Sequence, residues 1–269
     1  MNLKRVLTTL IGMPIVGAIL ILANKYVIDF ILMAISIICM YEYFTVISKV
    51  AHPIKWVGYV STIIVALIAF LSVQTIMQIV LFAIPILILV MFLKVIITNM
   101  ETTFKDVAYT FLGICYVTLF IMFLSLIRGL DNGKFIIGFV ILIAWATDIF
   151  AYLIGKYFGK HYFSKVSPKK TIEGCIAGAI GAIIVGIGYT LIINSFAYTG
   201  IDNYLAVGII SLILSIISQI GDFVASSIKR FADIKDYGNL LPGHGGMLDR
   251  IDSLIFIAPY AYLIFWLLI

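Results

Sequence analysis

Long apolar stretches limit most strongly what this chain can fold into. A helix needs about 20 consecutive, mostly apolar residues to cross a bilayer. The segments that approach this length are 6–23, 27–47, 56–73, 76–93, 107–127, 135–155, 175–193, 204–224 and 253–269. The pattern predicts an all-α, polytopic membrane protein with about nine transmembrane helices.

Composition supports a membrane protein and argues against an ordinary soluble domain. Hydrophobic residues make up 63% of the 269 residues and charged residues 12%, against about 45–50% and about 25% in soluble domains. Lys4 and Arg5 precede the first apolar run, as they would in a secretory signal. That run continues to about Ala23 and no A-x-A site follows it, so we interpret it as the first membrane span.

The basic residues predict the orientation, because Lys and Arg near span ends collect on the cytoplasmic side. With the N-terminus inside, all of the 18 Lys and Arg residues except Lys25, Arg128 and Lys134 fall in the cytoplasm. Topology then explains most of the net charge of +5, which needs no nucleic acid as a partner. Anionic lipid or phosphate would account for the remainder.

The polar sequence is concentrated in two cytoplasmic loops of the second half, at about 156–174 and 225–252. Chemistry at the membrane surface is expected there. We therefore divide the chain into N-terminal membrane helices, 1–105, which could be a scaffold, a lipid gate or a dimer surface, and a region that carries the catalytic motifs, 106–269.

Three acids, Glu42, Asp148 and Asp222, fall inside predicted spans or at their edges. A charge at the centre of a bilayer costs about 2.5–3.5 kcal/mol on insertion scales, so such residues are candidates for function. Glu42 lies close to a span end, which favours an interfacial or paired carboxylate. The neighbours of Asp148 and Asp222 favour a functional role.

Asp222 heads a helical face that continues through Ser226 to Lys229 and Arg230, because residues three and four apart are neighbours on a helix. Gln219 precedes it on the same face. The acid could hold a metal ion, and the two cations could hold phosphate. A Lys-Arg pair alone would be ordinary at a span end, but the deeper acid makes this face a candidate site.

A glycine-rich loop follows, with Gly243, His244, Gly245 and Gly246 before Asp249. Glycines let backbone N–H groups approach an anion closely, and the N-terminus of the final helix favours phosphate. Asp222 and Asp249 are expected to meet at the cytoplasmic rim, where two carboxylates suit Mg²⁺ with a polyphosphate. His244 could be a metal ligand, a proton donor or a structural loop residue.

The earlier loop offers a matching set of residues. Asp148 and Tyr152 share a helical face, and Lys169 and Lys170 stand beside Thr171 in a Ser-Pro-Lys-Lys-Thr segment. The two lysines could grip phosphates as point charges. The alternative, a basic loop that only sets topology, explains Lys156 and Lys160 but not this Ser-Pro and Thr context.

These motifs closely resemble the signature of the phosphatidate cytidylyltransferase family. The resemblance is carried by a Ser-Ser-Ile-Lys-Arg stretch at 226–230, Lys235-Asp236, and the 241–252 segment, which reads Leu-Pro-Gly-His-Gly-Gly-Met-Leu-Asp-Arg-Ile-Asp. The segments 167–171, 219–222 and 148–152 also fit. The matching motifs lie within about 145–252, while the first half resembles the family mainly in length and hydropathy.

The resemblance implies a magnesium-dependent nucleotidyl transfer, in which the phosphate of phosphatidic acid attacks the α-phosphorus of CTP. It implies that Asp222 and Asp249 bind one or two divalent ions, with a monovalent cation as a further option. The expected phosphate-holding residues are Lys229, Arg230 and Arg250. Further expected substrate contacts are Lys169, Lys170, Thr171, Ser226, Lys235, Gly243, His244, Gly245, Gly246 and Asp148. A homodimer in the bacterial cytoplasmic (inner) membrane is implied as well.

Other classes remain as alternatives. A transporter would suit many spans with buried acids, but it would tend to show internal repeats and interrupted helices near the midplane. A polyprenol kinase or a CDP-alcohol phosphotransferase would also be a membrane enzyme acting on lipid phosphates, but the D-x-x-D-G-x-x-A-R array of the latter is missing. A related cytidylyltransferase acting on an isoprenoid ether lipid would use the same headgroup chemistry.

Overall fold

A computed structural model describes residues 17, 19, 22–71, 73–164, 166–197, 202–240 and 245–268. The expected first span, 6–23, lies almost entirely outside these residues. Throughout the described part the regular structure is helical, with one isolated antiparallel bridge between Tyr162 and Thr171.

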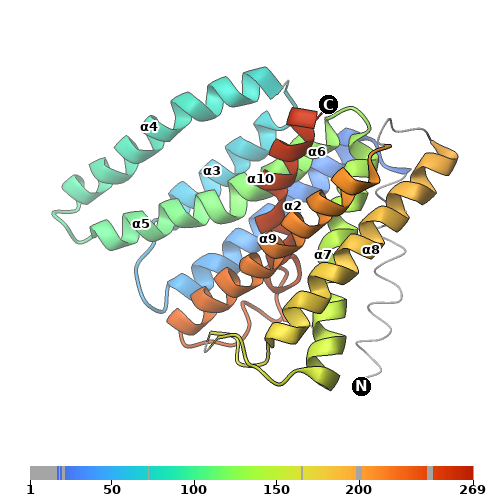
Figure 1. Cartoon of the computed structure of the whole chain (residues 1–269). Coiled ribbons are helices and arrows are strands. Elements are labelled where there is room, and N and C mark those ends of the chain that lie inside the picture. The colour runs from blue at the N-terminus through green and yellow to red at the C-terminus, as the bar shows by residue number, and fades with distance from the viewer. Residues whose placement is uncertain are drawn as a thin grey trace. The chain divides into compact units, whose positions relative to one another are not determined.

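The helices follow one another with short connections (Figure 1). They are α2 (Lys25–Ile47), α3 (Lys55–Ile68), α4 (Val73–Ile97), α5 (Phe104–Gly113), the π-helix η1 (Ile114–Leu119), α6 (Phe120–Arg128), α7 (Gly133–Phe158), α8 (Ile172–Phe196), α9 (Tyr204–Phe231) and α10 (Leu248–Leu268).

Seven helices within the described residues are long and apolar enough to cross a membrane, with α5, η1 and α6 forming one of them, Phe104–Arg128. The predicted spans from 27–47 onward each correspond to a helix, so the all-α, polytopic prediction is confirmed. The count of nine was approximate, because α3 has only 14 residues and ends at Ile68, five residues before the predicted end at 73.

The chain divides into two compact units, each described here by itself. The first comprises Met1–Leu126 and Phe231–Arg250, and the second comprises Ile127–Arg230 and Ile251–Ile269. The division expected from the sequence, at residue 105, separates the chain by function and not by compactness, and it stays a prediction.

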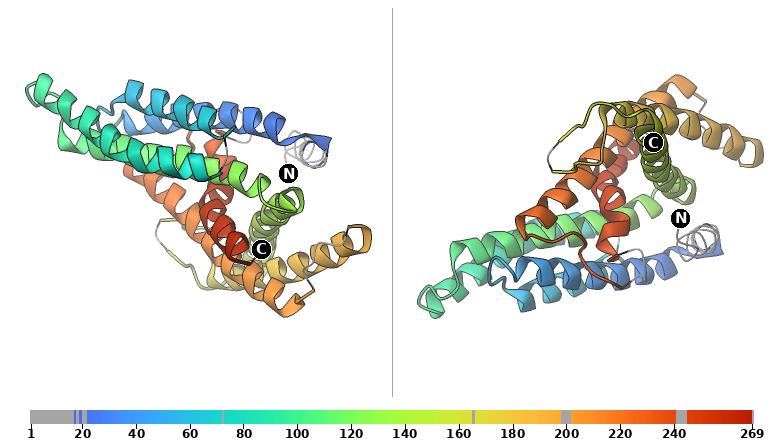
Figure 2. Two further views of the ribbon diagram at one scale, coloured as in Figure 1. Left: turned by 90° about the horizontal axis from the view of Figure 1, so that it is seen from above. Right: turned by 90° about the horizontal axis from the view of Figure 1, so that it is seen from below.

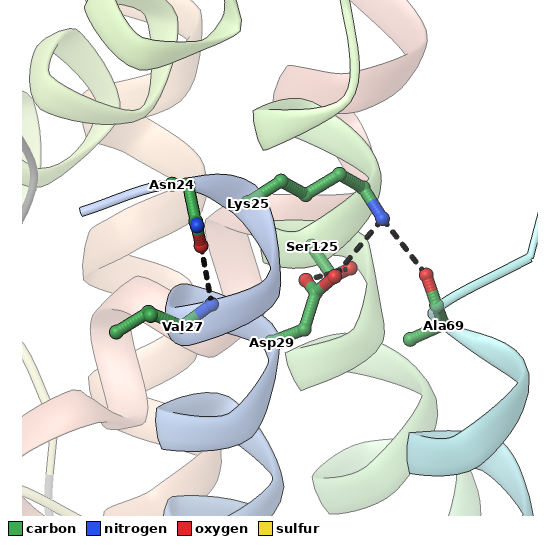
Figure 3. A network of polar contacts seen from close by, with 6 residues as sticks. All are labelled: Asn24, Lys25, Val27, Asp29, Ala69 and Ser125. Carbon is green, nitrogen blue, oxygen red and sulfur yellow. Dashed lines mark hydrogen bonds and ion pairs between the residues drawn. The ribbon is translucent and has the colours of Figure 1, made fainter.

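In the first unit, α2, α3 and α5 lie side by side (Figures 1 and 2). A buried ionic contact ties α2 to its neighbours: Asp29, whose side chain is fully buried, accepts hydrogen bonds from Lys25 Nζ at 2.9 Å and from Ser125 Oγ at 2.5 Å (Figure 3). Lys25 Nζ also donates to the carbonyl oxygen of Ala69 at 2.9 Å. The acid thus links α2 directly to α6 and, through Lys25, to the end of α3.

A second buried carboxylate, Asp106, lies in the first turn of α5. It forms a capping box with Thr103, in which helix cap and third residue satisfy each other's backbone N–H groups. Its Oδ1 atom also accepts from the backbone N–H of His52 at 2.6 Å. The connection between α2 and α3 is thereby fixed to the start of α5.

In the second unit, α7 and α8 pack along each other over most of their length (Figure 1). Glycines allow the close approach, since a Cβ at Gly174 would lie 2.6 Å from the carbonyl oxygen of Ala151, and one at Gly178 would lie 2.8 Å from that of Thr147. Gly188, in contrast, faces open space. The contact with α7 therefore requires glycine at 174 and 178 but not at 188.

The helices α9 and α10 also approach closely in this unit. A Cβ at Gly221 would lie 2.5 Å from Cβ of Phe256 and 3.2 Å from the carbonyl oxygen of Asp252. The residue after Gly221 is Asp222, so the glycine brings the candidate acid of α9 against the first turns of α10.

Candidate active site

The loop between α7 and α8 folds back on itself. The N–H of Phe163 donates to the carbonyl oxygen of Lys170 at 3.0 Å, and that of Ile172 donates to His161 at 2.9 Å. Thr171 is 4% exposed, and its hydroxyl accepts from the N–H of Gly174 as the N-cap of α8. Its observed contact is therefore to the helix, and its expected contact with substrate stays a prediction.

Glu173, in the first turn of α8, anchors the start of the same loop. Its carboxylate contacts Nδ1 of His161 at 2.6 Å and accepts from the backbone N–H of His161 at 3.3 Å. The first turn of α8 therefore holds both ends of the loop, one through Thr171 and one through Glu173.

Lys170, at the end of this loop, forms an ion pair with the carboxylate of Asp222 on α9. Its Nζ atom also lies 4.7 Å from the ring centroid of Phe223, on which Phe163 stacks at 4.9 Å. Lys169, one residue earlier, is exposed. Two motifs separated by about fifty residues in the sequence are thus joined by one charge pair.

Further acids gather around this pair. Asp252 on α10 is only 6% exposed and interacts electrostatically with Asp222, Lys229 and Asp148. Three helices, α7, α9 and α10, each contribute one carboxylate to this region of the second unit. The sequence named Asp148 and Asp222 as candidates, and the Asp-Arg-x-Asp spacing already contained Asp252 without revealing its burial.

Gln219 has a structural contact in this unit. Its amide nitrogen donates to the carbonyl oxygen of Cys175 at 3.1 Å, and one turn earlier Ser215 accepts from Thr147 at 2.8 Å. The polar face of α9 is therefore bonded to α7 and α8 at its deeper turns. Ser226 and Arg230 continue that face in the last two turns of the helix, where Arg230 is exposed.

The other half of the signature belongs to the first unit. Asp249 Oδ2 accepts from the backbone N–H of Tyr237 at 2.7 Å and from that of Gly246 at 3.0 Å. Gly245 has a positive φ of 82°, a backbone conformation that is unfavourable for residues with a Cβ atom. Lys235 and Arg250 are exposed, and Gly243 and His244 lie outside the described residues. The carboxylate of Asp249 closes this loop.

Glu42, on α2, meets the same loop from the N-terminal half of the chain. Its carboxylate is 4% exposed and accepts from the backbone N–H groups of Met247 at 2.9 Å and Leu248 at 2.8 Å. Backbone N–H groups that the sequence suggested for phosphate thus donate to protein carboxylates in the described structure. The expected contacts of Gly245 and Gly246 with phosphate stay predictions.

Among the described residues, no three His, Cys, Asp or Glu side chains converge as a group that could hold a metal ion. Asp222 belongs to the second unit and Asp249 to the first, so their pairing around a metal remains a prediction from the sequence.

The fold and the second unit's charges define a class: a helical membrane protein in which carboxylates from α7, α9 and α10 gather with lysine side chains. Comparison with known proteins makes this specific. The model of the Cytidylyltransferase family matches residues 3–268. The chain belongs to this family.

Relatives carry the name phosphatidate cytidylyltransferase. The Bacillus subtilis protein is 37% identical over 188 residues, which cover 69% of this chain and 66% of the relative. The Staphylococcus saprophyticus protein is 39% identical over 165 residues, and the Thermotoga maritima protein 36% identical over 167, each covering 61% of both chains. The matched part thus spans somewhat less than two thirds of these relatives.

Proposed function

We propose that this protein transfers CMP from CTP to phosphatidic acid, which yields CDP-diacylglycerol and pyrophosphate. Family membership and the names of the relatives support a cytidylyltransferase acting on phosphatidate. The observation that carries the proposal is the ion pair of Lys170 with Asp222, because it joins two of the motif segments on which the family resemblance rests.

The reaction joins an anion to a polyanion, so the protein must neutralise the repulsion between them. Cations placed around the transferring phosphoryl group do this, and little covalent chemistry is asked of the protein. In the proposal, Lys170 orients Asp222 and binds phosphate together with Lys169, while Lys229 and Arg230 at the end of α9 hold the nucleotide phosphates. Arg250 acts on the same anions from the start of α10.

Mg²⁺ belongs to the proposal as the ion that neutralises the triphosphate, and Asp222 and Asp249 are the residues that would hold it. Hard carboxylate oxygens suit this ion, which takes a few carboxylates and leaves other positions to water and phosphate. The chain offers such donors already oriented: Asp249 by the N–H groups of Tyr237 and Gly246, and Asp222 by Lys170.

The proposal also places the protein in the bacterial cytoplasmic membrane with the motif loops facing the cytoplasm, where CTP is available. The distribution of Lys and Arg supports this orientation. Single cysteines at Lys160 and at Lys134, introduced into a cysteine-free variant, would report it. A membrane-impermeant maleimide should label position 134 in intact cells and position 160 only after lysis, and the reverse would contradict the orientation.

The experiment that tests the activity supplies purified protein with phosphatidic acid, Mg²⁺ and CTP labelled at the α-phosphate. Label should enter the lipid phase only when phosphatidic acid and Mg²⁺ are both present. Label transfer to an isoprenoid lipid alone would change the substrate class, and a folded wild type that transfers none would refute the enzyme. Light scattering on the same preparation tests the proposed homodimer.

A further inference from the structure

Glu42 is a buried acid that the proposed chemistry does not use. It lies near the C-terminal end of α2, more than 200 residues before the loop that it contacts. Its Oε1 atom accepts from Met247 N–H and its Oε2 atom from Leu248 N–H, so both carboxylate oxygens are committed to the beginning of α10. A charge this deeply buried is expensive unless it is fully bonded.

These two contacts form a helix cap supplied by a distant segment. The first N–H groups of a helix have no partner within the helix, and a negative charge there is favoured by the helix dipole. A helix usually takes its cap from the residue just before it, which here is Met247 and has no side-chain oxygen to offer. A Cβ at Gly246 would lie 2.6 Å from Oε2 of Glu42, and one at Gly238 would lie 2.8 Å from Oε1. The two glycines therefore make room for the carboxylate.

Asp249 lies in the same first turn of α10 and is held from the other side of the loop by Tyr237 and Gly246. Glu42 and Asp249 together bind four backbone N–H groups within residues 237–248. Because consecutive amides are shared between the two acids, a shift of the helix start on losing Glu42 would move the carboxylate of Asp249.

We infer that Glu42 is a positioning residue for the reaction: from the N-terminal half, it fixes the start of α10 and thereby the orientation of Asp249 and Arg250. The inference rests on the proposed function for its kinetic consequence, whereas its structural content does not depend on it. It also gives the N-terminal helices a part in the active site.

The test compares Glu42→Gln with Asp106→Asn. Glu42→Gln keeps the shape but turns one acceptor into an NH₂ group that faces a backbone N–H. Asp106 is a matched control, since it is a buried acid of the same unit (2% exposed) that also accepts from backbone N–H groups, those of His52 and Thr103. Both variants should lower the melting temperature.

The two variants should differ in the Mg²⁺ concentration that their activity requires. Residues that orient metal ligands change metal affinity or activity by about 10- to 100-fold when replaced. We expect Glu42→Gln to raise the Mg²⁺ concentration for half-maximal activity by about tenfold and Asp106→Asn to leave it unchanged. A variant with wild-type Mg²⁺ dependence and only a lower melting temperature would overturn the inference. Glu42→Asp, too short to reach both amides, should behave as Glu42→Gln does.

Hydrogen exchange supplies a second measurement that needs no activity. In Glu42→Gln or Glu42→Asp, the amides in a peptide covering 245–252 should exchange faster than in the wild type, while a peptide covering 104–113 stays unchanged. Unaltered exchange at 245–252 refutes the cap. If the wild type transfers no cytidylyl group but the variants still exchange faster at 245–252 than the wild type does, the proposed function is refuted and the cap is established.

Discussion

Lys170 and Asp222 form an ion pair between the loop that precedes α8 and the C-terminal half of α9. Both side chains are about three-quarters buried, at 22% and 26% exposed. At such depth a pair of charges acts on its surroundings more strongly than it would in water, because screening is weaker. The pair is therefore suited to hold the carboxylate of Asp222 in one orientation.

Replacement of Lys170 should lower activity more than replacement of its neighbour Lys169. Lys170→Ala leaves Asp222 without its cation and should lower kcat/KM by about 100-fold, a loss typical of a removed electrostatic contact at a phosphoryl site. Lys169→Ala, on the exposed neighbour, should cost less than about tenfold, because exposed charges act through solvent. Steady-state label transfer measures both. A larger loss for Lys169→Ala than for Lys170→Ala would contradict the assigned role of the pair.

Removal of metal should abolish cytidylyl transfer and lower the thermal stability of the protein. A ligand that binds only the folded state at 100 times its Kd stabilises it by about 2.7 kcal/mol, so Mg²⁺ should raise the melting temperature of the wild type after treatment with EDTA. Asp249→Asn should lose this shift, whereas Asp106→Asn should keep it. If Asp249→Asn retains both the shift and the activity, Asp249 is not a metal ligand.

The packing of α8 against α7 predicts opposite results for one substitution at two glycines. Gly178→Ala places a methyl group 2.8 Å from the carbonyl oxygen of Thr147, and overpacking of this kind costs about 1–3 kcal/mol. Gly188→Ala meets nothing within 4 Å and gains up to about 1 kcal/mol of helix propensity. Thermal unfolding in detergent should show a lower midpoint for the first and an equal or higher midpoint for the second. Equal changes would refute the close contact.

The ion pair of Lys25 with Asp29 in α2 predicts that replacing one partner costs more stability than replacing the other. Lys25→Met leaves the fully buried carboxylate of Asp29 without its cation, and an uncompensated buried charge costs about 3–5 kcal/mol. Asp29→Asn leaves the lysine, which is 31% exposed, free to reach water; the cost should be about 1 kcal/mol, that of one hydrogen bond. Thermal unfolding of the two variants measures the difference, and a larger loss for Asp29→Asn would contradict it.

The positions of the membrane helices followed from the sequence, because an apolar run of spanning length has few stable alternatives in a bilayer. The ends were less well predicted. Apolar windows stopped at 224 and began at 175, whereas α9 continues to Phe231 and α8 begins at Ile172. Hydrogen bonding and the cap at Thr171 extend these helices into polar sequence that hydropathy does not count.

For the candidate site, residue types and spacing selected Asp222, Lys170 and Asp249 as candidates, because few sequences combine acids, cations and glycines at such intervals. Partners could not be identified in this way. Only the fold reveals that Lys170 pairs with Asp222, that Glu42 caps α10, and that Asp252 is buried near Asp148. Local sequence determines which segments enter the membrane, since that depends on the transfer of each segment from water. Contacts between segments far apart depend on how the helices pack, and no single segment encodes them.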